Sequence, residues 1–165
     1  MKFRIIDAVL EANEATKARM LEKIRGVLGD LGGKKIAVLG LSFKPDTDDM
    51  RESPALPVIE GLLAGGAEVR AYDPAAMAVT RATHPELGIT YCDNPYHAAE
   101  GADALVILTE WNQFRALELP RLESLMAAPL VIDLRNIYEP ARMVAAGFHY
   151  ISVGRPDAVP EGSRA

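Results

Sequence analysis

The chain has 165 residues, 49% of them hydrophobic and 25% charged, which suits one globular domain with room for a buried core. A net charge of -5 without a basic stripe argues against nucleic acid as a partner. The sequence contains no apolar run of about 18 residues and no signal-peptide pattern, so we expect a cytoplasmic protein with no membrane partner.

Residues 5–28 are predicted to form one long helix that ends at Gly29. Its apolar residues recur with a period near 3.5 and form one stripe, made of Ile6, Leu10, Met20, Ile24 and Val27. Asn13 and Lys17 interrupt this stripe. Two interpretations therefore stay open: a terminal helix packed on its own domain, or a helix shared with a second copy of the chain.

After Gly33, strand patterns alternate with helix patterns. Apolar strands are predicted at 35–41, 67–74, 88–93, 102–111, 129–136 and 148–156. Helices are predicted at 53–66 (with Ser53 as N-cap), 95–101, 112–128 (with a break or new start near Leu119) and 139–147.

This alternation predicts an α/β fold: a Rossmann-like, doubly wound, mostly parallel sheet with helices on both faces, preceded by the long N-terminal helix. The expected boundaries are a helix over 1–30, an α/β domain over 31–156 and a flexible tail over 157–165. Ligands of such sheets bind beyond the carboxyl ends of the strands. The loops at 41–52, 73–76, 109–115 and 134–139 are therefore the candidate site.

The first of these loops lacks the glycine-rich phosphate loop usual after the first strand of a dinucleotide-binding fold. Phe43 and Lys44 follow the strand instead, a combination suited to stacking on a base and holding a phosphate. The alternative is structural: Asp48 or Asp49 caps a turn, while Lys44 and Arg51 are solvated.

Acids and bases also end other strands. Asp73 occupies the place of a ribose-binding acid, but because Pro74 follows it a strand-ending turn is favoured. Asp133 needs a partner if it is buried. Arg135, just beyond it, is a surface arginine by default, or forms a diphosphate clamp with Lys44.

The remaining polar and aromatic residues give weaker indications of a functional site. The roles of Glu110 and Trp111 stay open; the tryptophan could simply cover the sheet edge. Cys92, the one cysteine, fits a reducing cytosol and is favoured as a structural thiol over a nucleophile. The three histidines lack ligand spacing, so no metal site is expected.

Four ordered motifs, "GLSFKPDTDDMRESP", "AYDP", "ILTEWNQF" and "VIDLRNIY", closely resemble the C-terminal UDP-sugar-binding domain of the UDP-glucose/GDP-mannose dehydrogenase family. The segments "TEWNQFRALEL" and "LRNIYEPARMVAAGF" are most similar to the UDP-glucose 6-dehydrogenases within it. The N-terminal helix is similar to the family's central helix, so the resemblance covers nearly the whole chain and implies a homodimer through that helix.

The resemblance implies an NAD-dependent enzyme that oxidises UDP-glucose to UDP-glucuronate, for polysaccharide biosynthesis, through a thioester on a catalytic cysteine. Neither the family's N-terminal NAD domain nor its cysteine motif is present in this sequence, so the segment alone is expected to be non-catalytic. By position, Phe43, Lys44 and Arg135 match residues that contact UDP or the UDP-sugar. Arg51 matches an arginine that reaches toward NAD.

Two other functions stay open. The chain could be a stand-alone nucleotide-binding or regulatory module, or a fragment of a GDP-mannose or UDP-N-acetylhexosamine dehydrogenase, since these share the "FK…DD…RESP" pattern. A complete small NAD-dependent oxidoreductase is disfavoured, because the sequence has neither a glycine fingerprint nor a catalytic dyad.

Overall fold

The computed structural model describes residues 4–162, and its centre is one six-stranded sheet in which every strand pair is parallel. The strand order is β3-β2-β1-β4-β5-β6. The strands are β1 (Lys35–Leu39), β2 (Glu68–Tyr72), β3 (Thr90–Tyr91), β4 (Ala104–Ile107), β5 (Leu130–Asp133) and β6 (His149–Ser152). The chain runs outward from β1 in one direction and then from β4 in the other, which is the doubly wound topology predicted from the sequence.

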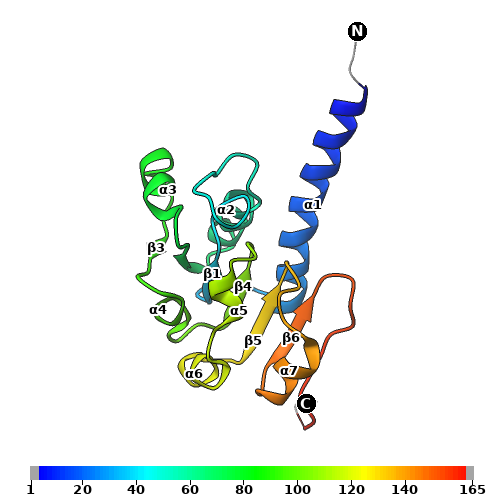
Figure 1. Cartoon of the computed structure of the whole chain (residues 1–165), viewed down its shortest axis with the longest axis vertical. Helices are drawn as coiled ribbons and strands as arrows, with labels where there is room; N and C mark the ends of the chain where they lie inside the picture. Colours follow the sequence, from blue (N-terminus) through cyan, green and yellow to red (C-terminus); the bar gives the residue numbers. More distant parts are fainter. Residues whose placement is uncertain (1–3, 163–165) are drawn as a thin grey trace.

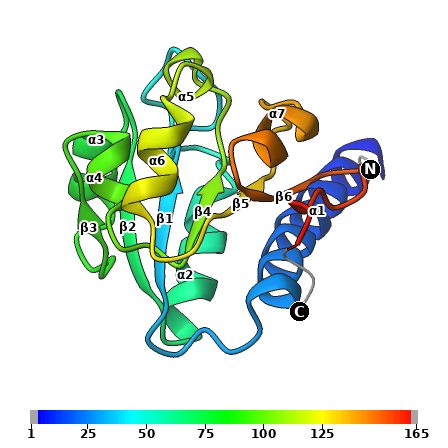
Figure 2. The same cartoon turned by 90° about the horizontal axis from the view of Figure 1, so that it is seen from below.

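Helices cover both faces of this sheet (Figures 1 and 2). They are α1 (Arg4–Leu28), α2 (Ala55–Ala64), α3 (Met77–Thr83), α4 (Pro95–Ala99), α5 (Asn112–Arg115), α6 (Leu119–Leu125) and α7 (Pro140–Ala145). One apolar cluster joins the sheet to α4, α5, α6 and α7, and the other joins it to α1, α2 and α3.

Strand β1 shows why the central strands are apolar throughout. Ile36 and Val38 belong to the cluster under α1 and α2, whereas Ala37 and Leu39 belong to the opposite cluster. Successive side chains of a strand point to opposite faces, so a strand covered on both sides buries nearly all of them; in β1 the four residues after the exposed Lys35 are buried. A continuous apolar run is therefore the signature of this position.

Helix α1 packs on the domain only through its C-terminal half. Its Leu21 approaches Gly61 of α2 so closely that a Cβ at Gly61 would lie 2.2 Å from Leu21 Cδ2. Arg25 donates a hydrogen bond to the Gly61 carbonyl (3.0 Å), and Ile24 is fully buried. The first turns of α1 project beyond the sheet (Figure 1), and their Ile6 and Leu10 are exposed. The predicted apolar stripe is thus split between a packed half and an exposed half.

Three local predictions need correction. Helix α2 begins at Ala55, two residues after the predicted N-cap; the Ser53 hydroxyl accepts from the Ala55 amide (3.2 Å) but donates to the Leu41 carbonyl (2.7 Å). Helix α3 was not predicted, because its short sequence contains β-branched Val and Thr and no cap signal. The expected tail over 157–165 is held at its start, since Ala158 and Tyr150 exchange two backbone hydrogen bonds; its residues 163–165 lie outside the described residues.

Candidate functional site

Asp73, at the end of β2, fixes the loop that follows β1. Its fully buried carboxylate accepts hydrogen bonds through Oδ2 from the amides of Leu41 (2.7 Å) and Ser42 (3.0 Å). Through Oδ1 it accepts from the amides of Ala75 and Ala76, both at 2.8 Å. Both oxygens are occupied by the protein itself, so the strand-ending interpretation of Asp73 is confirmed.

Asp133, at the end of β5, plays the same part for the loop that carries Arg135. It is fully buried, and the amides of Arg135 (3.0 Å), Ile137 (2.8 Å) and Tyr138 (3.2 Å) donate to it. The Tyr150 hydroxyl donates to Oδ2 at 2.6 Å. The expectation that a buried Asp133 has partners is confirmed, and these partners set the direction in which the main chain leaves β5.

The loops after β1 and β4 touch at Gly40. This residue has φ +98, and a Cβ there would lie 2.5 Å from Cβ of Thr109 and 2.7 Å from its backbone nitrogen. Thr109 donates from Oγ1 to the Ser42 carbonyl (2.8 Å), and the Trp111 indole donates to Ser42 Oγ (3.2 Å). Glycine is needed here for close approach of two main chains, and Trp111 takes part in holding the β1 loop.

The loop over residues 43–52 is folded on itself around Asp49. The Phe43 amide donates to the Asp49 carbonyl (2.8 Å), and Arg51 grips the Asp49 carboxylate through Nε (3.0 Å) and a terminal nitrogen (2.9 Å). The hydrogen bonds from the Arg51 side chain and amide lower the pKa of Asp49 to about 2. Asp46 and Glu52, both with φ 61, have the left-handed backbone conformation that is uncommon outside glycine.

A cavity of about 250 Å³ opens at the carboxyl edge of the sheet, between α1 and the loops after β1 and β5. Phe43 and Arg135, predicted from separate loops, both line it. The other lining residues are Asn13, Thr16, Lys17, Met20, Glu52 and Pro54. We call this space the α1 cavity. It presents an exposed aromatic ring and two cationic side chains, a set suited to an anionic ligand with a flat ring.

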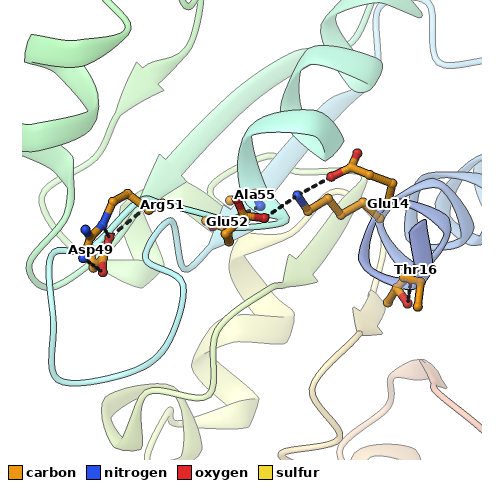
Figure 3. Close-up of polar contacts among 9 residues, drawn as sticks. Glu14, Thr16, Asp49, Arg51, Glu52 and Ala55 are labelled. Atoms are coloured by element: carbon orange, nitrogen blue, oxygen red, sulfur yellow. Dashed lines mark hydrogen bonds and ion pairs between the residues drawn. The ribbon is translucent and has the colours of Figure 1, made fainter. Parts of the chain in front are cut away.

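Both cations of the α1 cavity are held by carboxylates. Lys17 lies 2.8 Å from Glu14 of the same helix and 3.6 Å from Glu52 (Figure 3). The hydrogen bond that Lys17 donates to Glu14 and the charges of Glu14 and Glu52 raise the pKa of Lys17, against the effect of its burial. Arg135 donates from Nε to Glu110 at 2.6 Å. Burial raises the pKa of Glu110, but this hydrogen bond and the charge of Arg135 outweigh it, so the pKa is lowered overall.

The structure separates the other two predicted residues from this cavity. Lys44 is exposed and does not line it, although its neighbour Phe43 does. Arg51 lines a second hollow of about 610 Å³, between the 43–52 loop and α3, together with Asp48, Asp49 and His84. Figure 3 shows Arg51 and Asp49 at one side of the loop and Glu52 facing α1 at the other.

Sequence reasoning missed the contribution of α1 to the site. Asn13 and Lys17 interrupt the apolar stripe of the predicted helix, a pattern that left open whether the helix packs on its own domain or is shared with a second copy. In the structure both line the α1 cavity, and the Lys17 side chain is only 13% exposed. The signal was the spacing of four residues, which puts two polar side chains on one face of a helix.

The remaining candidates do not form a site of their own. Cys92 is a buried free thiol, and burial raises its pKa, as expected for a structural cysteine. Residues 4–162 contain no group of three or more His, Cys, Asp or Glu side chains arranged to hold a metal ion. Across the same residues, no helix is long and apolar enough to cross a membrane.

The strand order, the all-parallel sheet and the position of the cavity define a Rossmann-like α/β domain with its site at the carboxyl edge. Residues 37–140 match the model of the UDP-glucose/GDP-mannose dehydrogenase family, UDP binding domain. The chain therefore belongs to this family, as its motifs had indicated.

Known relatives agree with this assignment. The UDP-glucose 6-dehydrogenase of Rhizobium meliloti (strain 1021) is 48% identical over 155 residues, covering 93% of this chain and 35% of that protein. The UDP-glucose 6-dehydrogenase of Pseudomonas aeruginosa PAO1 is 46% identical, with 91% and 35% covered. The structure of a UDP-glucose dehydrogenase from Pyrobaculum islandicum superposes with a TM-score of 0.73 at 32% identity, with 92% and 32% covered. The chain thus spans about a third of the length of these relatives.

Proposed function

We propose that the chain is the UDP-sugar-binding part of a UDP-glucose 6-dehydrogenase, which oxidises UDP-glucose to UDP-glucuronate with NAD in a cytosolic pathway of polysaccharide biosynthesis. The observation that carries the proposal is that Phe43 and Arg135 line one cavity at the carboxyl edge of a domain matched to the UDP binding family. A buried free cysteine is compatible with a reducing cytosol.

In this proposal, uracil stacks on the exposed ring of Phe43, and Arg135 and Lys44 contact the diphosphate. Ligand sites usually measure about 300 to 1,000 Å³, so the α1 cavity of about 250 Å³ holds only part of a UDP-sugar. The remainder of the ligand would extend out of the cavity, where Lys44, which is exposed and follows Phe43, would contact its phosphates.

We assign Arg51 to the cofactor rather than to the UDP-sugar. Its side chain is 88% exposed and faces a hollow different from the α1 cavity. An arginine presented outward by a bidentate carboxylate is preorganised to meet a phosphate brought by another part of the enzyme. NAD itself would be held mainly by the family's N-terminal domain, and the chain alone would be non-catalytic.

We also propose that the chain forms a homodimer through α1. The contact face is not the whole predicted stripe, because Asn13 and Lys17, which interrupt it, line the α1 cavity. It consists instead of the exposed apolar residues of the first turns, namely Ile5, Ile6, Val9 and Leu10. A stable dimer buries at least about 1,000 Å² in total. Sedimentation that shows a strict monomer at high protein concentration would contradict this assignment.

Calorimetry of the purified chain with UDP, UDP-glucose, GDP-mannose and NAD tests the proposed function. We expect binding of UDP and UDP-glucose, weaker binding of GDP-mannose and no measurable heat with NAD. Preference for GDP-mannose would instead assign the chain to a GDP-mannose dehydrogenase of the same family. Absence of binding to every nucleotide would refute the proposal for this chain.

A further inference from the structure

We propose that Lys17 of α1 is a direct contact of the ligand's diphosphate, and that it exchanges Glu52 for the ligand when the site fills. This inference rests on the proposed function, and it adds a residue from outside the strand-end loops. Helix α1 would then be part of the binding site, in addition to its role as a connector.

Lys17 is largely buried at the α1 cavity. It lines the α1 cavity together with Phe43 and Arg135, and its side chain is only 13% exposed although it belongs to an otherwise exposed stretch of helix. A lysine normally keeps its ammonium group in open water. Here the ammonium group donates a hydrogen bond to the Glu14 carboxylate, one turn earlier on the helix, at 2.8 Å. The ammonium group is therefore oriented before any ligand arrives.

The second contact of Lys17, with Glu52, is weak. Glu52 lies 3.6 Å from the ammonium nitrogen, beyond hydrogen-bond distance, and its side chain is 59% exposed. Glu52 also has a left-handed backbone, so its place beside Lys17 is imposed by the loop. Exposed ion pairs contribute little to stability, so giving up this contact costs little. Glu14 can remain bound throughout, because an ammonium group has three donors.

Arg135 lines the same cavity and is also paired with a carboxylate. Among residues 4–162, its guanidinium makes one hydrogen bond, from Nε to Glu110, and its terminal nitrogens have none. The cavity thus places two cations next to an exposed aromatic ring: Lys17, which is paired with Glu14 and Glu52, and Arg135, which is paired with Glu110. A diphosphate carries more negative charge than a single carboxylate and offers more acceptor oxygens, so it can displace Glu52 from Lys17.

A comparison of Lys17→Met and Glu52→Gln by UDP titration tests the exchange. Lys17→Met should weaken UDP binding by about 10-fold or more, the effect of losing a hydrogen bond from a charged group. Glu52→Gln should strengthen UDP binding by about two- to five-fold, because it removes the carboxylate that competes with the ligand for Lys17. This factor corresponds to the small interaction free energy of an exposed ion pair. Lys23→Met, which removes the same charge from α1 but lines a different cavity, should leave the affinity unchanged.

The result expected from the exchange alone is that Lys17→Met lowers the affinity for UDP whereas Glu52→Gln raises it. If Lys17 merely clamps α1 to the loop, both changes break the same clamp and both weaken UDP binding, which overturns the proposal. Equal affinity in Lys17→Met and in the unchanged chain also overturns it, while leaving the proposed UDP function intact. Failure of the unchanged chain to bind UDP refutes the proposed function and this inference together. Far-ultraviolet circular dichroism and urea unfolding confirm that each variant is folded.

Discussion

Ser42 donates two hydrogen bonds to the same oxygen of Asp73, one from its amide (3.0 Å) and one from its hydroxyl (3.2 Å). The two residues are 31 positions apart in the chain and join the ends of neighbouring strands. Asp73 also accepts from the Leu41 amide of the β1 loop and from the Ala75 and Ala76 amides that follow it in the chain, so it anchors the loops after both strands.

We therefore expect Asp73→Asn to destabilise the fold although it keeps the shape of the side chain. The new amide nitrogen must face backbone donors, leaving buried N–H groups unsatisfied, which costs at least about 2 kcal/mol of unfolding free energy. Urea unfolding measures the loss. Asp48→Asn, on an exposed side chain of the neighbouring loop, is the control and should stay within about 0.5 kcal/mol. Equal stability of both variants would show that Asp73 is not an anchor.

Gly40→Ala should be among the most damaging single substitutions. It combines a positive φ with a Cβ 2.5 Å from Thr109 Cβ, so we expect a loss of about 2 to 5 kcal/mol. Gly33→Ala separates the two causes, because Gly33 also has positive φ (+73) but has no atoms within 4 Å of the added Cβ. That control should lose only about 1 to 2 kcal/mol. Thermal unfolding of the pair gives the difference due to close approach.

The Asp49–Arg51 pair should make a pH-dependent contribution to stability. The folded-state pKa of Asp49, about 2, lies below the ordinary value of 3.8. The contribution of the pair to stability is therefore present above about pH 4 and is lost as the pH falls toward 2. A carboxyl-detected NMR titration should find the low pKa. Arg51→Met should return it toward 3.8, because the arginine hydrogen bonds are its main cause. An unchanged pKa in that variant would mean that the pair does not form in solution.

Lys44→Ala should weaken UDP binding about 10- to 150-fold, the equivalent of about 1.5 to 3 kcal/mol for a lost charged hydrogen bond. Lys44→Arg should restore it only in part, since a planar fork replaces a compact ammonium group. Arg51→Ala should leave UDP affinity nearly unchanged, because Arg51 lies in the other hollow. Calorimetry of the three variants decides the assignment. Equal losses for Lys44→Ala and Arg51→Ala would show that the loop has been misinterpreted.

Cys92 should resist thiol reagents in the folded chain. It is 1% exposed, and burial raises its pKa, so the reactive thiolate is both scarce and shielded at neutral pH. A disulfide-forming reagent should label it slowly in buffer and rapidly in urea. Rapid labelling of the folded chain, or NAD reduction that disappears in Cys92→Ser, would contradict its structural role.

The sequence was sufficient for the central strands, because burial on both faces leaves a continuous apolar run in β1 and β4. It also located Arg135 and Phe43 in the correct loops, since parallel strands end at one edge. It could not show that Phe43 lines the α1 cavity while adjacent Lys44 does not, because this depends on how the loop folds around Asp49. Nor could it bring α1 to the site: Asn13 and Lys17 are far from the strand ends in sequence, and only packing of α1 on Gly61 places them there.

The buried carboxylates of Asp73 and Asp133 also determine when the entropy of ordering the site is lost. Each holds several amides of a loop that would otherwise sample many conformations. The chain loses that freedom as it folds, so a nucleotide meeting these two loops does not have to order them again. Its binding free energy is reduced only by the smaller rearrangements that remain, those of exposed side chains around the α1 cavity.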